Sequence, residues 1–108
     1  MAGKMERRRY SRVRTKFELL YSAGQEEGTG VLSDISYSGA LVEETLLRPA
    51  VGTRVRLYVF LQPVFPFEII GDVVRHTHDG FALEYKLVDP EVRQLVDEAA
   101  AIVARSQD

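Results

Sequence analysis

The sequence predicts a mainly β domain: a small six-stranded antiparallel β-barrel followed by one C-terminal α-helix. Between residues 13 and 88, short segments alternate apolar and polar side chains at period two, which is typical of strands with one buried face. Turn residues separate these segments, and after residue 89 the apolar spacing becomes that of an amphipathic helix. A barrel accommodates such strands most economically because it leaves no open edge.

Six segments carry the strand pattern: 17–22, 29–36, 39–46, 52–61, 67–76 and 81–88. The clearest is 52–61, where Val55, Leu57 and Val59 face one way and polar or aromatic side chains face the other. A turn at "SYSG" joins the second and third segments, and "HDG" joins the last two. Prolines interrupt the apolar stretch 61–67, which we expect to cover the core rather than dock a partner.

The closing helix is expected over about residues 89–105. Asp89 can cap its N-terminus, Pro90 fits its first turn, and Glu91 complements its positive end. The apolar positions at helical spacing are Val92, Leu95, Val96, Ala99, Ile102 and Val103. This stripe is expected to pack on the barrel or over one of its mouths. The barrel and helix therefore form one domain over 13–108, preceded by a flexible basic arm over 1–12.

Charge is concentrated at the start of the chain. Residues 1–16 hold seven basic side chains and one acidic, a local charge of +6, whereas the rest holds seven basic and fifteen acidic, or −8. A protein that binds a nucleic-acid polymer usually extends its basic surface over the body of the domain. The arm therefore suits a small anion better than a polymer.

Composition argues against several other classes of function. The chain has no cysteine, which removes disulfides and thiolate chemistry and fits a cytoplasmic location. No apolar run approaches the roughly 18 residues of a membrane span, and no secretory signal is evident. His76 and His78 would share one face of a strand, yet two ligands are too few for an ordinary zinc site, so we expect a solvated strand end and no metal. No catalytic constellation is present, so an enzyme is not expected.

The first informative motif is R-x-x-x-R, formed by Arg8 and Arg12. A guanidinium can grip a phosphate or the O6/N7 edge of guanine with two hydrogen bonds while its face stacks on a base. In extended chain the two backbones would lie about 13 Å apart, which is the scale of a dinucleotide. A solvated basic tail is the alternative, and for this motif alone it is favoured.

The second motif is D-x-S-x-x-G, formed by Asp34, Ser36 and Gly39. On a strand, Asp34 and Ser36 would project from one face, where a carboxylate can accept hydrogen bonds from guanine N–H groups and a hydroxyl can bind a base edge or phosphate. Gly39 would allow a positive φ or a close approach of ligand to backbone. An ordinary Asx or Ser turn is the alternative, and it is favoured for this motif taken alone.

Together, the order R-x-x-x-R, strand, D-x-S-x-x-G, further strands and a final helix resembles the PilZ domain family. The resemblance covers roughly residues 7–105 and includes "IGDVVRHTHDGFALEY", which is similar to the late paired strands of that domain. Members of the family bind the bacterial second messenger cyclic di-GMP. The resemblance thus implies a nucleotide-binding signal transduction protein with cyclic di-GMP as its ligand and no cofactor.

The resemblance also implies six ligand-binding positions: Arg7, Arg8, Arg12, Asp34, Ser36 and Gly39. Arg8 and Arg12 match the arginines that hold guanine and phosphate groups, and Asp34 and Ser36 match residues that contact a guanine. An arginine at the position of Arg7 goes with a stacked, two-molecule form of the ligand. Three further residues could line the same surface without a role in either motif: Arg9, Tyr10 and Arg75.

The predicted function is that of a cyclic di-GMP receptor in which the ligand orders the arm against the barrel and so alters binding of a protein partner. The alternative is a protein–protein adaptor of the same fold that works without nucleotide. Nucleic-acid binding by the arm is a third hypothesis, which the acidic body of the domain disfavours.

Overall fold

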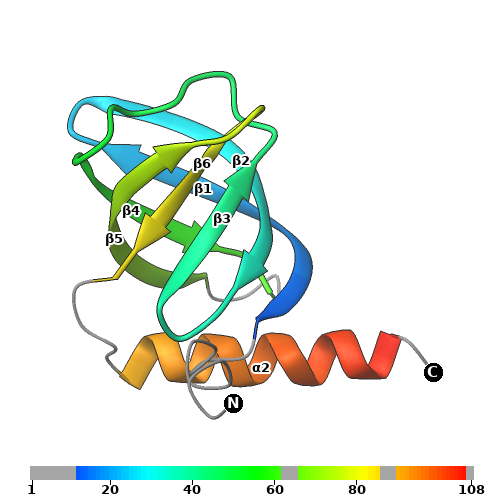
Figure 1. The fold of residues 1–108 in the computed structure, drawn as a ribbon. Coiled ribbons are helices and arrows are strands. Elements are labelled where there is room, and N and C mark those ends of the chain that lie inside the picture. Colours follow the sequence, from blue (N-terminus) through cyan, green and yellow to red (C-terminus); the bar gives the residue numbers. More distant parts are fainter. Residues whose placement is uncertain (1–11, 62–65, 86–89, 107–108) are drawn as a thin grey trace, which may run out of the picture.

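The computed structural model describes residues 12–61, 66–85 and 90–106 (Figure 1). The elements are β1 Val13–Ala23, β2 Glu26–Ile35, β3 Gly39–Glu43, β4 Arg54–Val59, β5 Phe67–His76, β6 Phe81–Glu84 and α2 Pro90–Ser106. All neighbouring strands are antiparallel, and they close a barrel in the order β1-β2-β3-β6-β5-β4. The predicted six-stranded antiparallel barrel with one C-terminal helix is confirmed.

Two three-stranded meanders build the barrel. The strands β1, β2 and β3 follow one another in the chain and pair in that order, and β4, β5 and β6 do the same. Two seams join the meanders: β1 pairs with β4, as in Leu20 opposite Tyr58, and β3 pairs with β6, as in Leu41 opposite Ala82.

The barrel interior is apolar and is filled by alternate side chains of the strands. The largest side chains with no more than a trace of exposure include Leu19, Leu32, Ile35, Leu57 and Phe81. Fully burying a side chain of this kind contributes about 1.5–3 kcal/mol relative to leaving it in water. The period-two pattern of the sequence therefore located the core correctly.

Helix α2 crosses one end of the barrel (Figure 1). Its buried stripe joins the barrel core through Val92, Leu95, Val96 and Ala99. Of the two placements expected for the stripe, on the barrel or over one of its mouths, the structure shows the second.

The helix begins at Pro90, as the sequence predicts, while Asp89 lies outside the described residues. Glu91 stands in the first turn, where its charge complements the helix dipole. Its Oε2 also accepts a hydrogen bond from the backbone N–H of Glu68, at 3.0 Å. This contact ties the start of α2 to the start of β5.

The end of β5 differs from the prediction. The strand stops at His76, and a hydrogen bond from the N–H of Thr77 to the carbonyl of Gly80, at 2.9 Å, closes a turn that contains His78. The two histidines therefore do not share a strand face. His76 Nε2 lies 2.8 Å from the carbonyl oxygen of Pro49. Within the described ranges, no group of three or more His, Cys, Asp or Glu side chains could hold a metal ion.

Two segments bear on other expectations. The predicted arm over 1–12 lies outside the described residues except for Arg12. In the apolar stretch 61–67, Leu61 and Phe67 pack against the core, which favours a covering role, whereas 62–65 are not described. No helix in the described part of the chain is long and apolar enough to cross a membrane.

Candidate functional site

A β-bulge turns Asp34 to the outside of the barrel. Leu32 pairs with Val42 and Asp34 pairs with Leu41, so β2 has one more residue here than β3. Because Leu32 is fully buried, strict alternation would point Asp34 into the core as well. The extra residue shifts the alternation, so Ile35 takes the next buried position and Asp34 faces outward.

A second bulge does the same for Arg75 on β5. Val73 pairs with Leu83 and Arg75 pairs with Ala82, which leaves an extra residue, Val74, on β5. Ile69 and Val73 are buried, so an unbroken alternation would direct Arg75 inward. With the bulge, Val74 and Arg75 are both exposed.

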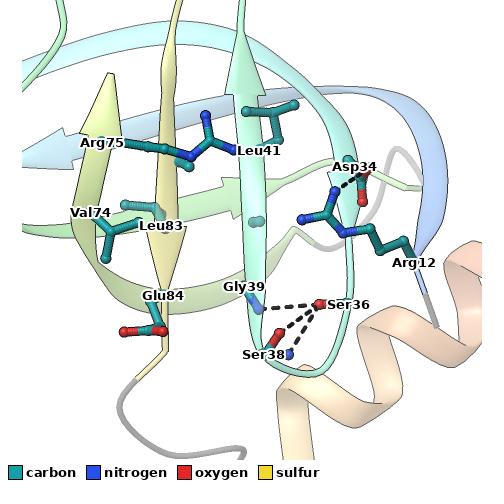
Figure 2. Close-up of a pocket in the computed structure, with 12 residues that line it drawn as sticks. Arg12, Asp34, Ser36, Ser38, Gly39, Leu41, Val74, Arg75, Leu83 and Glu84 are labelled. Atoms are coloured by element: carbon teal, nitrogen blue, oxygen red, sulfur yellow. Dashed lines mark hydrogen bonds and ion pairs between the residues drawn. The ribbon is translucent and has the colours of Figure 1, made fainter. Parts of the chain in front are cut away.

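The two bulges flank a pocket of about 180 Å³ on the outer wall of the barrel (Figure 2). Strands β2, β3, β6 and β5 lie side by side beneath it. The polar groups of its lining belong to Arg12, Asp34, Ser36, Ser38, Arg75 and Glu84. Leu41 and Ala82, from the two central strands, add apolar surface between the bulges.

Arg12 and Asp34 form an ion pair at the edge of this pocket. Arg12 Nη1 lies 3.6 Å from Asp34 Oδ2, and the two side chains are 70% and 16% exposed, respectively. A pair with one partner so exposed stabilises the fold by at most about 1 kcal/mol. A ligand can therefore displace Arg12 from the carboxylate at little cost.

The pKa of Asp34 is raised above its ordinary value, chiefly because partial burial disfavours the charged form. The positive charges of Arg12 and of Arg14, which pairs with Asp34 across β1 and β2, lower the pKa and offset part of this effect. At neutral pH the pocket thus holds a carboxylate that is incompletely solvated and ready to accept hydrogen bonds.

We expect Asp34→Asn to raise the melting temperature slightly at pH 7. A carboxyl whose folded pKa is raised contributes stability below its unfolded pKa, near 3.8, and loses that contribution as the pH rises through the folded value. At pH 7 the amide of the variant avoids the free-energy cost of burying a charge. Near pH 3 Asp34 is itself protonated, so the variant and the wild type should have the same stability there. Circular dichroism melts at both pH values measure the difference.

Asp79→Asn, in the exposed turn before β6, is the matched control and should leave both melting temperatures unchanged. A lower melting temperature for Asp34→Asn at pH 7 would mean that attraction to Arg12 and Arg14 outweighs the burial of Asp34.

Ser36 organises the turn between β2 and β3. Its Oγ accepts hydrogen bonds from the N–H groups of Ser38, at 3.2 Å, and Gly39, at 3.3 Å. Its own N–H donates to the carbonyl of Gly39, at 2.9 Å. The prediction that Ser36 stands beside Asp34 on a strand is wrong, because β2 ends at Ile35 and the hydroxyl is drawn into the turn. Both side chains nevertheless line the pocket.

Gly39 is required by the packing of β3 against β6. Among the described glycines, a positive φ occurs at Gly24 and Gly52 and not at Gly39, so the first of the two roles predicted for Gly39 does not apply. A Cβ on Gly39 would instead collide with the backbone carbonyl oxygen of Leu83. Because Gly39 has no side chain, β3 and β6 can stay at hydrogen-bonding distance. The backbone of Gly39 also lines the pocket.

Tyr37, at the centre of the same turn, connects it to helix α2. The Tyr37 hydroxyl donates a hydrogen bond to Asp97 Oδ1 at 2.8 Å, and this bond raises the pKa of Tyr37. The guanidinium carbon of Arg93 lies 5.5 Å from the centre of the Tyr37 ring, within the range of a cation–π contact. Sequence reasoning missed this link, because nothing local to Tyr37 indicates which part of the distant helix it meets.

The structure brings together four of the six predicted site residues: Arg12, Asp34, Ser36 and Gly39. Arg7 and Arg8 lie outside the described residues. Arg75 joins the four, which fits the expectation that it could line the same surface. A signal for it exists in the sequence, since it is a charged residue at a position where alternation would place an apolar one.

Several solved structures share this fold. The chain is similar to the PilZ domain of CeSA from a cellulose-synthesizing bacterium, with 17% identity and a TM-score of 0.69 over 82% of this chain and 96% of that one. It is similar to the PilZ domain of Escherichia coli YcgR with c-di-GMP, with 20% identity and a TM-score of 0.68 over 94% of each chain. It is also similar to the Bacillus subtilis inhibitor of motility MotI/DgrA, with 19% identity and a TM-score of 0.70 over 94% of this chain and 53% of that one.

No curated protein sequence matches the chain. The family model of the PilZ domain, in contrast, matches residues 6–101. That match takes in the two motifs, all six strands and most of α2. The chain therefore belongs to the PilZ domain family.

Proposed function

We propose that the chain is a cytoplasmic, non-enzymatic receptor for cyclic di-GMP. The ligand would bind between the basic arm, with Arg7, Arg8 and Arg12, and the barrel surface. One observation carries the proposal: residues from two separate motifs, Arg12 from the first and Asp34 from the second, meet at a single pocket. Membership of the PilZ domain family and the similarity to a YcgR domain with c-di-GMP support it.

The chemistry of the pocket suits guanine. A guanine base presents N–H donors on one edge and the acceptors O6 and N7 on another. The Asp34 carboxylate can accept from the donor edge, and the Arg12 guanidinium can donate to the acceptors or to a phosphate. Charge-assisted bonds of this kind are stronger than neutral ones, so they can replace the loose Arg12–Asp34 pair.

The size of the pocket favours a site built from two parts. Its volume of about 180 Å³ is below the roughly 300–1,000 Å³ that is usual for sites of drug-sized ligands. We infer that residues 1–12 act as a switch segment and supply the missing wall, with Arg8 contacting the ligand and Arg7 a stacked second molecule. Binding would then order the arm against the barrel.

The contact between Tyr37 and Asp97 offers a route for the output. The turn that carries Ser36 and Gly39 is hydrogen-bonded to α2 through Tyr37. A ligand that shifts this turn would also alter the position or exposure of α2. We propose that a protein partner reads the resulting surface, formed by the ordered arm and the helix.

We expect isothermal titration of the full chain with cyclic di-GMP to give saturable binding with a Kd of low micromolar or tighter, about −8 kcal/mol or better. The driving contacts are the charge-assisted bonds of Arg12 and Asp34 with guanine and phosphate. Amide resonances of Ser38 and Gly39 should shift in parallel, because their N–H groups line the pocket turn.

Cyclic di-AMP is the matched control ligand, since it shares the phosphates and ring but lacks the guanine donor edge that Asp34 would bind. It should bind at least tenfold more weakly. If cyclic di-GMP gives neither heat nor shifts at Ser38 and Gly39, the receptor proposal fails and the nucleotide-independent adaptor takes its place.

A further inference from the structure

We propose that Arg75 binds a second guanine, at the end of the pocket opposite Asp34. The inference rests on the proposed cyclic di-GMP site and names a residue that neither sequence motif contains. Three observations support the inference: the register of the strands, the exposure and contacts of the Arg75 side chain, and the surface between the two ends of the pocket.

The register puts Asp34 and Arg75 in one row across the barrel wall. Asp34 pairs with Leu41, Leu41 pairs with Ala82, and Ala82 pairs with Arg75. Three strand spacings of about 4.8 Å separate the ends of the row, or roughly 14 Å between backbones. In Figure 2 the guanidinium groups of Arg75 and Arg12 approach β3 from opposite sides. The row therefore offers an arginine at each end, with Arg12 beside Asp34 and Arg75 opposite them.

The side chain of Arg75 points away from the barrel core. The β5 bulge exposes it, and within the described ranges its side chain makes no ion pair or hydrogen bond. Arg54 and Arg56, on the neighbouring strand β4, are in contrast paired with Asp72 at 3.3 Å and Glu68 at 3.0 Å. No described residue therefore engages the five donors of the Arg75 side chain, and we expect them to be available to a ligand.

The surface between the two ends suits the flat face of a purine. In the middle of the row Leu41 is partly exposed and Ala82 is buried, and Val74, which is 44% exposed, borders Arg75. A base lying on Leu41 and Val74 would bury apolar surface while its edge meets the guanidinium of Arg75. Bulges commonly redirect a side chain beside a binding site, and here a bulge stands at each end of the row.

We expect Arg75→Ala to weaken binding of cyclic di-GMP about 10- to 100-fold in a calorimetric titration, the range of one bidentate contact with guanine. Arg75→Lys should weaken it nearly as much, because lysine keeps the charge but cannot form the two parallel bonds. Arg56→Ala, which removes an equal charge from a residue already paired with Glu68, is the matched control and should bind like the wild type.

The mixed guanine–adenine cyclic dinucleotide shows where the second guanine comes from. If one ligand molecule spans the row, the stoichiometry is one ligand per chain. The guanine of the mixed ligand then lies at Asp34 and its adenine at Arg75, so Arg75→Ala should bind the mixed ligand no more weakly than the wild type does. If two stacked molecules fill the row, with a stoichiometry of two, each can supply a guanine, and Arg75→Ala should still weaken the mixed ligand. Both results support the assignment.

Three results would overturn it while leaving the receptor proposal intact. Arg75→Ala could match Arg56→Ala in its affinity for cyclic di-GMP. Arg75→Lys could retain full affinity, which would mean that charge alone acts there. Arg75→Ala could also weaken the mixed ligand as much as cyclic di-GMP at a stoichiometry of one. Failure of the wild type to bind any cyclic dinucleotide would instead overturn the proposed function itself.

Discussion

Replacing Asp34 with alanine is expected to lower the affinity for cyclic di-GMP by about 100-fold while the barrel stays folded. The carboxylate faces the pocket at the β2 bulge and is only 16% exposed, so a guanine bonded to it would be shielded from competing water. One bidentate contact with a base edge contributes about 1–3 kcal/mol, and the upper part of that range corresponds to this factor. Isothermal titration with the wild type and the variant measures it.

Asp79→Ala is the matched control, because it removes a carboxylate of the same size from an exposed turn away from the pocket. Its affinity should equal that of the wild type. Acidification gives a second check: since burial raises the pKa of Asp34, wild-type affinity should fall as the pH drops through that raised value, whereas the alanine variant should lack this component. Equal affinities for Asp34→Ala and Asp79→Ala would contradict a guanine contact at Asp34.

Replacing Gly39 with alanine is expected to destabilise the fold by about 3 kcal/mol, the upper part of the range for overpacking a tight site. The added Cβ would meet the carbonyl oxygen of Leu83, a backbone atom in the paired strand that cannot rotate away. Relief requires β3 and β6 to separate, which weakens their hydrogen bonds. Urea unfolding followed by circular dichroism measures the loss.

Gly24→Ala is the control for the general cost of losing a glycine. Gly24 has a φ of 64° in the turn between β1 and β2, and no atom lies within 4 Å of an added Cβ. It should cost about 1 kcal/mol from the backbone conformation alone. If Gly39→Ala lost ligand affinity but matched Gly24→Ala in stability, the glycine would serve the approach of ligand and not the packing of strands.

The strands and the helix could be predicted because their signals are local. Alternation identified the buried faces around Leu57 and Phe81, and helical spacing identified the stripe of α2. The order of strands could not be predicted, since the pairings of β1 with β4 and of β3 with β6 join segments far apart in the chain. Some strand ends were also predicted wrongly. The segment 39–46 was expected as a strand, but β3 ends at Glu43 because Glu44 has a φ of 60°.

The site was predictable to the extent that motifs reveal residue types. The second motif predicted three residues on one surface: Asp34, Ser36 and Gly39. The structural roles of two of them were not predicted. The hydroxyl of Ser36 stabilises the turn between β2 and β3, and Gly39 allows β6 to pack closely. The break in alternation at Arg75 is visible in the sequence, but the bulge that turns this side chain outward is defined only by the pairing with β6. Motif spacing therefore predicted residues that line one pocket, and the pairing register explains why Arg75 joins them there.

The pocket straddles the seam where β3 meets β6, with Asp34 on the first meander and Arg75 on the second. A molecule that contacts Asp34 and Arg75 at the two ends of the pocket would link the two meanders. A ligand that binds only when the two meanders are paired adds its binding free energy to the free energy of unfolding of the barrel. Saturating ligand would therefore stabilise the pairing of β3 with β6. On the proposed function, the contacts that hold the ligand would therefore also stabilise the barrel against unfolding.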